Sequence, residues 1–522
     1  MRGVCLSVLV VFLAGCTMVG PDYQPGAQPQ LPSAWSDEET AQATREVGAW
    51  WKLFNDPDLN ELIARGARQN LSIAAAGLRI VQARAALGIS DALLFPQQQQ
   101  VDGNFTGLYR NEDWFKSAGA SLDVGWEMDI WGKYARGIES SEASLYASIA
   151  SYHDVLVSIS AEIARNYINY RTAEERMYLS RQNIAIQQRV VDMTQVQFDA
   201  GNVSELDVQQ AKAQLYATQS TLPSLNIVRL QTRNAIAVLI GTTPQEMEPL
   251  LTAAAVPRVP DFEKRLVDVS RPGDVAAHYA RYSVIPVAPE LQKTVDAQVV
   301  MRRPDLQVAE LQARAQSARI GLAEADLYPQ FFLFGSVGVS QTVRSSNSFD
   351  LSDSVTASIG PGFSWNIFQY GRIRNRVRIE DALFQESLTN YNQGVLEAVR
   401  EVSNALEGYH NNVEKSQFDL SAVEAAIRAF NISFNQYNNG LVSYQRLLST
   451  VETMTLREDA YAQTRGSIAN QVVALYKALG GGWEPFRNQP VVDPSTVKQM
   501  ESRTDWGDYL QPRTISGEDR SE

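Results

Sequence analysis

The chain is poor in the residues that most often support metal binding and nucleophilic catalysis. Its 522 residues include two cysteines, Cys5 and Cys16, and three histidines, His153, His278 and His410, which form no His-x-x-x-His pair. The sequence also lacks a phosphate loop of the Walker type. These shortages argue against metal ligation and cysteine catalysis. We therefore expect no enzyme activity, no cofactor and an energy source that resides in another protein.

Basic charge and long apolar runs are scarce as well. The formal net charge is -13. Binding to a phosphate backbone requires a basic face, so the charge argues against nucleic acid as a partner. After residue 16, no segment of the sequence resembles the run of about 20 apolar residues that a transmembrane helix needs. If the mature chain enters a membrane, it must do so as β-strands.

The N-terminus has the pattern of a lipoprotein signal. Arg2 precedes a short apolar run, and Leu13-Ala14-Gly15-Cys16 matches the bacterial lipobox, which is cut before the cysteine. We predict a signal peptide over 1–15 and a covalent lipid on Cys16, followed by a lipidated segment over 16–60. An ordinary signal with a chance cysteine is the alternative. Thr17 stands where an Asp would favour the inner membrane, so we expect the outer membrane.

The chain contains an internal repeat. Leu94-Phe95-Pro96-Gln97 recurs 233 residues later as Leu327-Tyr328-Pro329-Gln330. The element from Trp126 to Gly132 recurs 239 residues later, and the Gly-Asn-Val-Ser turn at Gly201 recurs with the same shift as Gly-Leu-Val-Ser. Several motifs in one register favour a true duplication. The predicted organisation is repeat 1 over 61–250, an equatorial linker over 251–300, repeat 2 over 301–483 and a polar tail over 484–522, which lies on the collar or is disordered.

Each repeat contains segments in which apolar and polar residues alternate. In 120–130 and 355–367 the apolar residues occupy every second position, which places them on one face of a strand. Segments 101–109 and 331–341 are weaker, with Phe105, Tyr109, Phe332 and Phe334 as large apolar residues. The lengths fit membrane strands, although strands of a soluble sandwich alternate in the same way. Four strands cannot close a barrel, so we predict that several chains share one barrel.

Two long segments predict unusually long helices. Lys133 to Ala200 and Arg372 to Asn439 contain no proline, and each would extend roughly 100 Å as a helix. Apolar residues such as Val155, Ile159 and Ile163 form a single stripe, which is typical of coiled coils. Glycine follows each segment and can adopt the positive φ of a tight reversal. The fold class predicted is therefore mixed, with long coiled-coil helices and membrane strands.

Taken together, the motifs resemble those of TolC-like outer-membrane efflux proteins, in the NodT-type lipoprotein branch. The resemblance covers roughly 13–483 and rests on the order and spacing of several short motifs, which include Cys16–Tyr23, Trp50–Leu59, Arg303–Glu310 and Ala478–Trp483. It implies a homotrimer with a twelve-stranded barrel in the cell outer membrane and a twelve-helix tunnel across the periplasm. It also implies an exit duct that serves an inner-membrane pump and a periplasmic adaptor.

The resemblance assigns a role to the two Gly-x-Val-Ser turns. They correspond to the periplasmic tips at which the adaptor docks, with the residues Gly201, Val203, Ser204, Gly440, Val442 and Ser443. Two alternatives to an efflux duct remain open. One is a duct of the same fold for protein secretion, and the other is a lipid-anchored coiled-coil protein without a pore.

The gate of the family is altered in this sequence. In the best-known members, an Asp six residues after the first tip glycine bonds to a Tyr and an Arg near the second tip. Asp207 and Tyr437 occupy those positions, but Val442 replaces the Arg. We predict that Asp207 pairs with Arg446, its equivalent in repeat 2, and hydrogen-bonds Tyr437. The alternative is that both charges face water, where such a pair contributes only about 0–1 kcal/mol.

Overall fold

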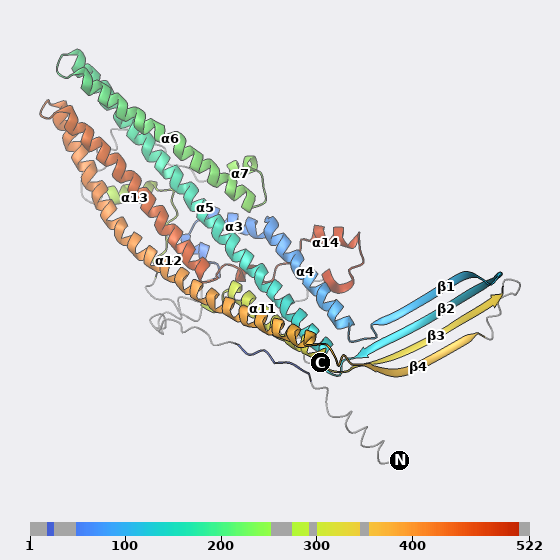
Figure 1. Cartoon of the computed structure of the whole chain (residues 1–522). Coiled ribbons are helices and arrows are strands. Elements are labelled where there is room, and N and C mark those ends of the chain that lie inside the picture. The colour runs from blue at the N-terminus through green and yellow to red at the C-terminus, as the bar shows by residue number, and fades with distance from the viewer. Residues whose placement is uncertain (1–17, 26–47, 252–273, 292–299, 345–353, 511–522) are drawn as a thin grey trace.

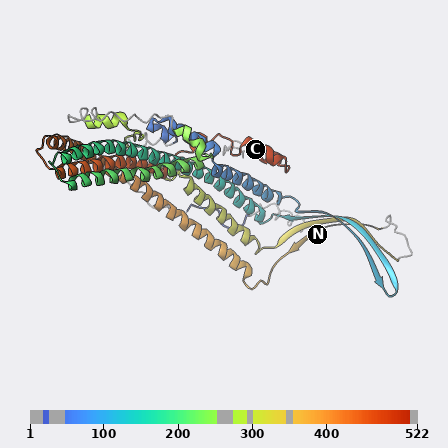
Figure 2. The same cartoon turned by 90° about the horizontal axis from the view of Figure 1, so that it is seen from above.

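The molecule is elongated, with a long layer of helices at one end and a small curved sheet at the other (Figures 1 and 2). The computed structural model describes residues 18–25, 48–251, 274–291, 300–344 and 354–510. The predicted signal peptide over 1–15, Cys16 and much of the 251–300 linker lie outside these residues.

The sheet contains four antiparallel strands in the order β1-β2-β3-β4. Their bounds are Gln98–Arg110 for β1, Asp113–Met128 for β2, Gln330–Arg344 for β3 and Val355–Ser364 for β4. The strand expected over 120–130 thus begins at Asp113. The residues between Asp113 and Ala120 do not alternate strictly, so the sequence pattern missed them, but pairing with β1 holds them in the sheet. The strand expected over 355–367 ends earlier, at Ser364.

Strand register separates an apolar face from a polar face. Leu122 pairs with Val101 on one side and with Val337 on the other, and Val337 pairs with Ala357. Directly paired residues point to the same side of a sheet, so these apolar residues share one face across all four strands.

The opposite face is mostly polar and includes three phenylalanines, one of which is Phe115 of β2. It carries Ser121, Asp123 and Ser336, which occupy the positions between the apolar ones. Phe332 and Phe334 also lie on this face, because they pair with Gly362 and Gly360. Their grouping with the apolar stripe of the segment 331–341 was therefore wrong, since Leu333 and Val337 form that stripe. A Cβ atom on Gly362 would lie 2.3 Å from the Phe332 ring, so the ring covers the glycine closely.

Three pairs of helices of equal length show the duplication. Both α4 (Leu71–Ala92) and α11 (Pro304–Ala325) have 22 residues, and both α5 (Lys133–Asp199) and α12 (Arg372–Asn438) have 67. The returning helices α6 (Glu205–Leu239) and α13 (Tyr444–Ala478) have 35 residues each. The other helices in the described ranges are η3 (Trp50–Phe54), α3 (Pro57–Gln69), α7 (Pro244–Leu251), α9 (Asp274–Tyr282), η5 (Glu484–Phe486), α14 (Pro494–Glu501) and η6 (Gly507–Leu510).

One stretch, Pro57–Ala92, is long and apolar enough to cross a membrane by length and composition alone. The sequence reading had found no such segment. Asn70 divides it into α3 and α4, because its extended backbone ends α3 and its side chain accepts bonds from Ser72 and Ile73 at the start of α4. Both helices pack against α5. We therefore assign the stretch to the helical layer.

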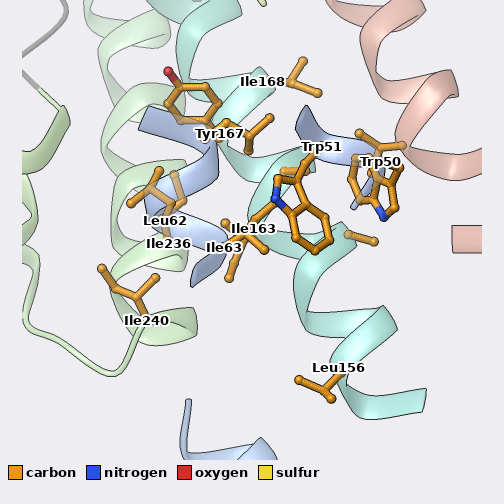
Figure 3. Packing of buried hydrophobic residues seen from close by; sticks show 14 of the residues in the cluster. Trp50, Trp51, Leu62, Ile63, Leu156, Ile163, Tyr167, Ile168, Ile236 and Ile240 are labelled. Atoms are coloured by element: carbon orange, nitrogen blue, oxygen red, sulfur yellow. The ribbon is translucent and has the colours of Figure 1, made fainter. Parts of the chain in front are cut away.

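The largest core lies where η3 and α3 pack against α5 and α13 (Figure 3). Trp50 is fully buried and stacks on Tyr476, with ring centroids 5.7 Å apart. Trp51 stacks on Phe486, with centroids 5.9 Å apart. Aromatic residues bury large areas, so this cluster links the N-terminal segment at Trp50 and Trp51 firmly to the C-terminal segment at Tyr476 and Phe486.

The described part of the polar tail, 484–510, packs on the helical layer. Val492 and Met500 form a small apolar cluster with Val81 of α4, and η6 also contacts α4. The sequence had left open whether the tail lies on the protein or is disordered. The described part, 484–510, lies against the body of the protein.

Candidate functional site

The two tips are open helix reversals centred on glycine. Gly201 and Gly440 have φ of 78° and 72°, in the left-handed region that glycine adopts without strain. In both turns, the N–H groups of the glycine and of the next residue donate to carbonyls of the last helical turn, over 2.8 to 3.0 Å. This is a Schellman-type helix end. No atom lies within 4 Å of a Cβ built on either glycine, so only backbone conformation requires glycine there.

The helix starts after the two tips differ in charge. At the start of α6, the Asp207 carboxylate accepts hydrogen bonds from the Ser204 N–H at 3.0 Å and the Ser204 hydroxyl at 2.8 Å. This arrangement is a capping box. At the same position of α13 stands Arg446, and the Ser443 side chain makes no capping bond. A cation near a helix N-terminus is unfavourable by roughly 0.3–1 kcal/mol. Arg446 therefore does not stabilise its own helix.

The predicted contact of Asp207 with Arg446 and Tyr437 is not formed within one chain. No ion pair joins Asp207 to Arg446, and no hydrogen bond joins it to Tyr437, in the part of the chain that the structure describes. Tyr437 is buried, with its ring edge against Tyr444 at 6.1 Å. Burial and, to a smaller degree, the Asp207 charge raise the Tyr437 pKa. The Asp207 charge thus acts on the Tyr437 hydroxyl without a hydrogen bond between them, while the Asp207 carboxylate bonds to Ser204.

A short strap near the N-terminus, residues 18–25, crosses the helices beside the sheet. The Val19 N–H donates to the Trp131 carbonyl at 3.1 Å. Arg136 of α5 is almost fully buried beneath the strap, and its guanidinium donates to the carbonyls of Val19 and Gly20 at 3.1 and 3.0 Å. It also pairs with Asp22 at 2.9 Å. These bonds tie the strap to the start of α5.

The described part of the linker, 274–291, is tied to the middle of the long helices. Ser283 donates to the buried carboxylate of Glu175 at 2.5 Å, and Arg465 of α13 pairs with that carboxylate at 3.0 Å. Tyr279 packs edge-on against Tyr461 at 5.1 Å. These contacts join α9 to α5 and α13 about half-way along the layer.

The sequence did not single out the buried arginines, and the expectation that the acidic pair Glu174-Glu175 lies on a solvated face was wrong for Glu175. Arg136, Arg171 and Glu175 are each at most 3% exposed. The signal was present, because Arg171 directly follows Tyr170 and lies one helical turn after Tyr167 in the apolar stripe of α5. In the structure its guanidinium pairs with Glu174 of the same helix at 2.8 Å and with Asp58 of α3 at 3.1 Å. A charge within an apolar stripe indicates a partner from another segment, but the sequence does not say which one.

The scattered histidines have no shared site. His153 stacks on Trp483, with centroids 4.1 Å apart, and burial followed by the nearby charge of Arg487 lowers the His153 pKa to about 4. Over the described ranges, no group of three or more His, Cys, Asp or Glu residues is arranged to hold a metal ion.

Comparison with known proteins agrees with this architecture. The model of the family described as "Outer membrane efflux protein" matches residues 62–242 and 297–481. Nodulation protein T of Rhizobium leguminosarum bv. trifolii is 26% identical over 481 residues, which cover 91% of this chain and 96% of the relative. The probable outer membrane lipoprotein SilC of Salmonella typhimurium is 25% identical, with 92% and 98% covered.

Solved structures show the same fold. The outer-membrane channel OprN superposes with a TM-score of 0.75 at 30% identity, covering 90% of this chain and 100% of that channel. The two matched segments of the family model coincide with the two structural repeats, and both tips lie inside them. The chain therefore belongs to the outer membrane efflux protein family, with the TolC-like channel fold, and acts as an outer-membrane exit duct for efflux.

Proposed function

We propose that three copies of this chain form one duct, with a shared twelve-stranded barrel in the membrane and a twelve-helix tunnel below it. The observation that carries the proposal is the four-stranded sheet, whose outer strands β1 and β4 have no further partner strand in the described chain. In hydrocarbon, each unpaired backbone group would cost several kcal/mol. Three sheets joined edge to edge satisfy all of them.

The two faces of the sheet fit this arrangement. The apolar face carries highly exposed side chains, such as Val101 at 76% and Ile359 at 81%, and would contact lipid. The polar face, with Ser121, Asp123 and Ser336, would line a water-filled lumen. A helix of 67 residues extends roughly 100 Å, which is long enough for a tunnel that leads away from the membrane.

The strap supports a lipid anchor at the junction of sheet and helices. Only Thr17 separates Cys16 from Met18, so the two Cα atoms are at most about 7 Å apart. A Cβ on Gly132, at the start of α5 beside the sheet, would lie 2.4 Å from the Met18 side chain. A diacylglyceryl group on Cys16 would therefore enter the same membrane surface that the strands enter.

The partners proposed are an adaptor that docks on the two tips and an inner-membrane pump. The tips are distant from the sheet (Figure 1), and their glycines have open space around them, as a docking surface requires. The duct would thus work in a tripartite export machine, without a cofactor beyond the covalent lipid.

The test is the stoichiometry and conductance of the purified chain. In mild detergent, native mass spectrometry should give a three-chain species, and the same sample should produce single-channel steps in planar bilayers. A conducting monomer would contradict the shared barrel. A trimer without conductance would favour the pore-less coiled-coil alternative.

A further inference from the structure

The two repeats make the same contacts at the base of the sheet. The Trp126 indole N–H donates to the Leu94 carbonyl at 3.0 Å, and the Trp365 indole N–H donates to the Leu327 carbonyl at 3.0 Å. These four residues are repeat equivalents. The duplication is therefore accurate enough in this region to compare the surroundings of one repeat with those of the other.

One aromatic contact, however, has no counterpart in the other repeat within the part of the chain that the structure describes. Trp131, just before α5, stacks on Tyr328, just before β3, with centroids 4.8 Å apart. Its indole N–H donates to the Pro329 carbonyl at 2.7 Å. Trp131 comes from repeat 1 and Tyr328 from repeat 2, so this contact joins the two repeats.

The repeat equivalents of these two rings lie on the surface. Tyr370 is the equivalent of Trp131 and is fully exposed, while Phe95 is the equivalent of Tyr328 and is 68% exposed. Tyr370 also has a φ of 48°, which is uncommon for a residue with a side chain.

The helices below the rings show the same imbalance. α11 packs on two long helices, α12 of its own repeat and α5 of the other repeat. Its equivalent α4 packs on α5 of its own repeat, but within the described chain it does not pack on α12, the long helix of the other repeat. The outer sides of both helices are covered at equivalent glycines. A Cβ on Gly321 would clash with the Val19 carbonyl of the strap, and a Cβ on Gly88 would clash with the Tyr509 hydroxyl of the tail. The open side of α4 is therefore the side that would receive an α12 helix.

The residues on these open sides are complementary. Where α11 meets α5, Arg319 donates to the buried Ser140 at 3.4 Å. The equivalents of this polar pair are Ala86 on α4 and Ile379 on α12. Both are exposed, Ile379 by 59%. A polar pair within the chain is thus replaced by an apolar pair on its two free edges, which fits a contact between copies.

We propose that Tyr370 stacks on Phe95 of the partner subunit and that Ile379 packs against the partner's Ala86, which repeats between copies the contact that Trp131 and Tyr328 make within one copy. The proposal rests on the proposed trimer and names the surface that holds it together. The second copy is chosen as occupant because both halves of the missing contact are present on opposite edges of the same chain.

The test uses pairs of cysteines, since Cys5 and Cys16 are the only cysteines in the sequence and both are expected to be removed or lipidated. Phe95→Cys with Tyr370→Cys should react with a short thiol crosslinker to give a covalent trimer on a denaturing gel. A crosslinker is preferable to a disulfide, which cannot bridge Cα atoms more than about 7 Å apart. The matched control is Trp131→Cys with Tyr328→Cys, which should crosslink inside one chain and leave the monomer band.

The outcomes separate this contact from the proposed function. A native trimer that gives no covalent trimer with the Phe95/Tyr370 pair overturns the contact and leaves the shared duct intact. A monomer overturns both. If the first pair prevents assembly, Ala86→Cys with Ile379→Cys replaces it with the same expectation. Independently, Phe95→Ala and Tyr370→Ala should lower the temperature at which the trimer dissociates, and the double variant should lower it little further; additive losses would contradict the contact.

Discussion

Asp207 caps its own helix by accepting hydrogen bonds from both the N–H and the hydroxyl of Ser204. The carboxylate therefore has a local role even if it also pairs with Arg446 when three tips come together. Because a simple Asp207→Ala change removes both roles, the gate must be tested with a variant that separates them.

Asp207→Asn keeps a side-chain oxygen for the capping box and removes the charge. If Asp207 pairs with Arg446, the Asn variant and Arg446→Ala should each raise the resting conductance, and the double variant should exceed either one only slightly. Arg446→Asp should shift ion selectivity towards cations, since a ring of carboxylates attracts them. Asp207→Ala should in addition destabilise the start of α6 by about 0.5–2 kcal/mol.

The measurement for these variants is single-channel current and reversal potential in planar bilayers. Glu205→Gln is the control, because it removes a neighbouring charge of α6 that makes no capping bond. If the Asn and Arg446→Ala variants conduct like the parent, Asp207 is only a helix cap and the closing contacts lie elsewhere.

Bulk at the tips should block docking of the adaptor. Ser204→Trp together with Ser443→Trp places large rings beside turns that now have open space around them. We expect loss of export in cells with unchanged amounts of trimer, measured by substrate efflux and by native gels. Trp substitutions at the exposed positions Gln188 and Ala429, away from the tips, serve as the control. Unimpaired export by the tip variant would move the docking surface elsewhere.

Cys16 should carry the lipid. Cys16→Ser removes the thiol that the diacylglyceryl group needs, so labelling with radioactive palmitate should disappear. The trimer should still form, because the strands and helices provide its contacts. Labelled lipid on the Ser variant would refute the assignment of the anchor.

Arg136 should hold the strap that connects the anchor to the body. Arg136→Gln loses charge-assisted bonds to Val19, Gly20 and Asp22, which we expect to cost about 1.5–3 kcal/mol. Limited proteolysis should then cut the strap faster than in the parent. Arg319→Gln on α11 is the matched control, because Arg319 is exposed and makes only longer bonds. Equal cleavage of both variants would show that other contacts position the strap.

His153 should make stability fall in mild acid. Its pKa is about 4 in the folded chain, where it stacks on Trp483, against an ordinary value of about 6.5. Above pH 6.5 the side chain is neutral in both states. Between pH 6.5 and about 4 the unfolded chain binds a proton that the folded chain does not, so stability decreases as the pH falls. The melting temperature of His153→Phe should fall less over this interval, and an equal fall in both proteins would contradict the assignment.

Periodic and repeated features could be read from the sequence alone. The duplication, the two 67-residue helices, the glycine turns at Gly201 and Gly440, and the alternation in β2 and β4 each depend on local spacing, because helices and strands present their side chains at fixed periods. The resemblance to the efflux family rested on the same short motifs, and the family comparison confirms it.

Features that depend on which segments meet were decided only by the tertiary structure. The start of β2 at Asp113 comes from pairing with β1, and the place of Phe332 on the polar face comes from its register with Gly362. The sequence predicted Arg446 and Tyr437 as partners of Asp207, whereas within one chain its carboxylate accepts hydrogen bonds from Ser204. Arg136 acquired its role from a strap more than a hundred residues away. Local sequence determines periodicity, whereas register, burial and the choice of a partner for a buried charge follow from contacts between distant segments.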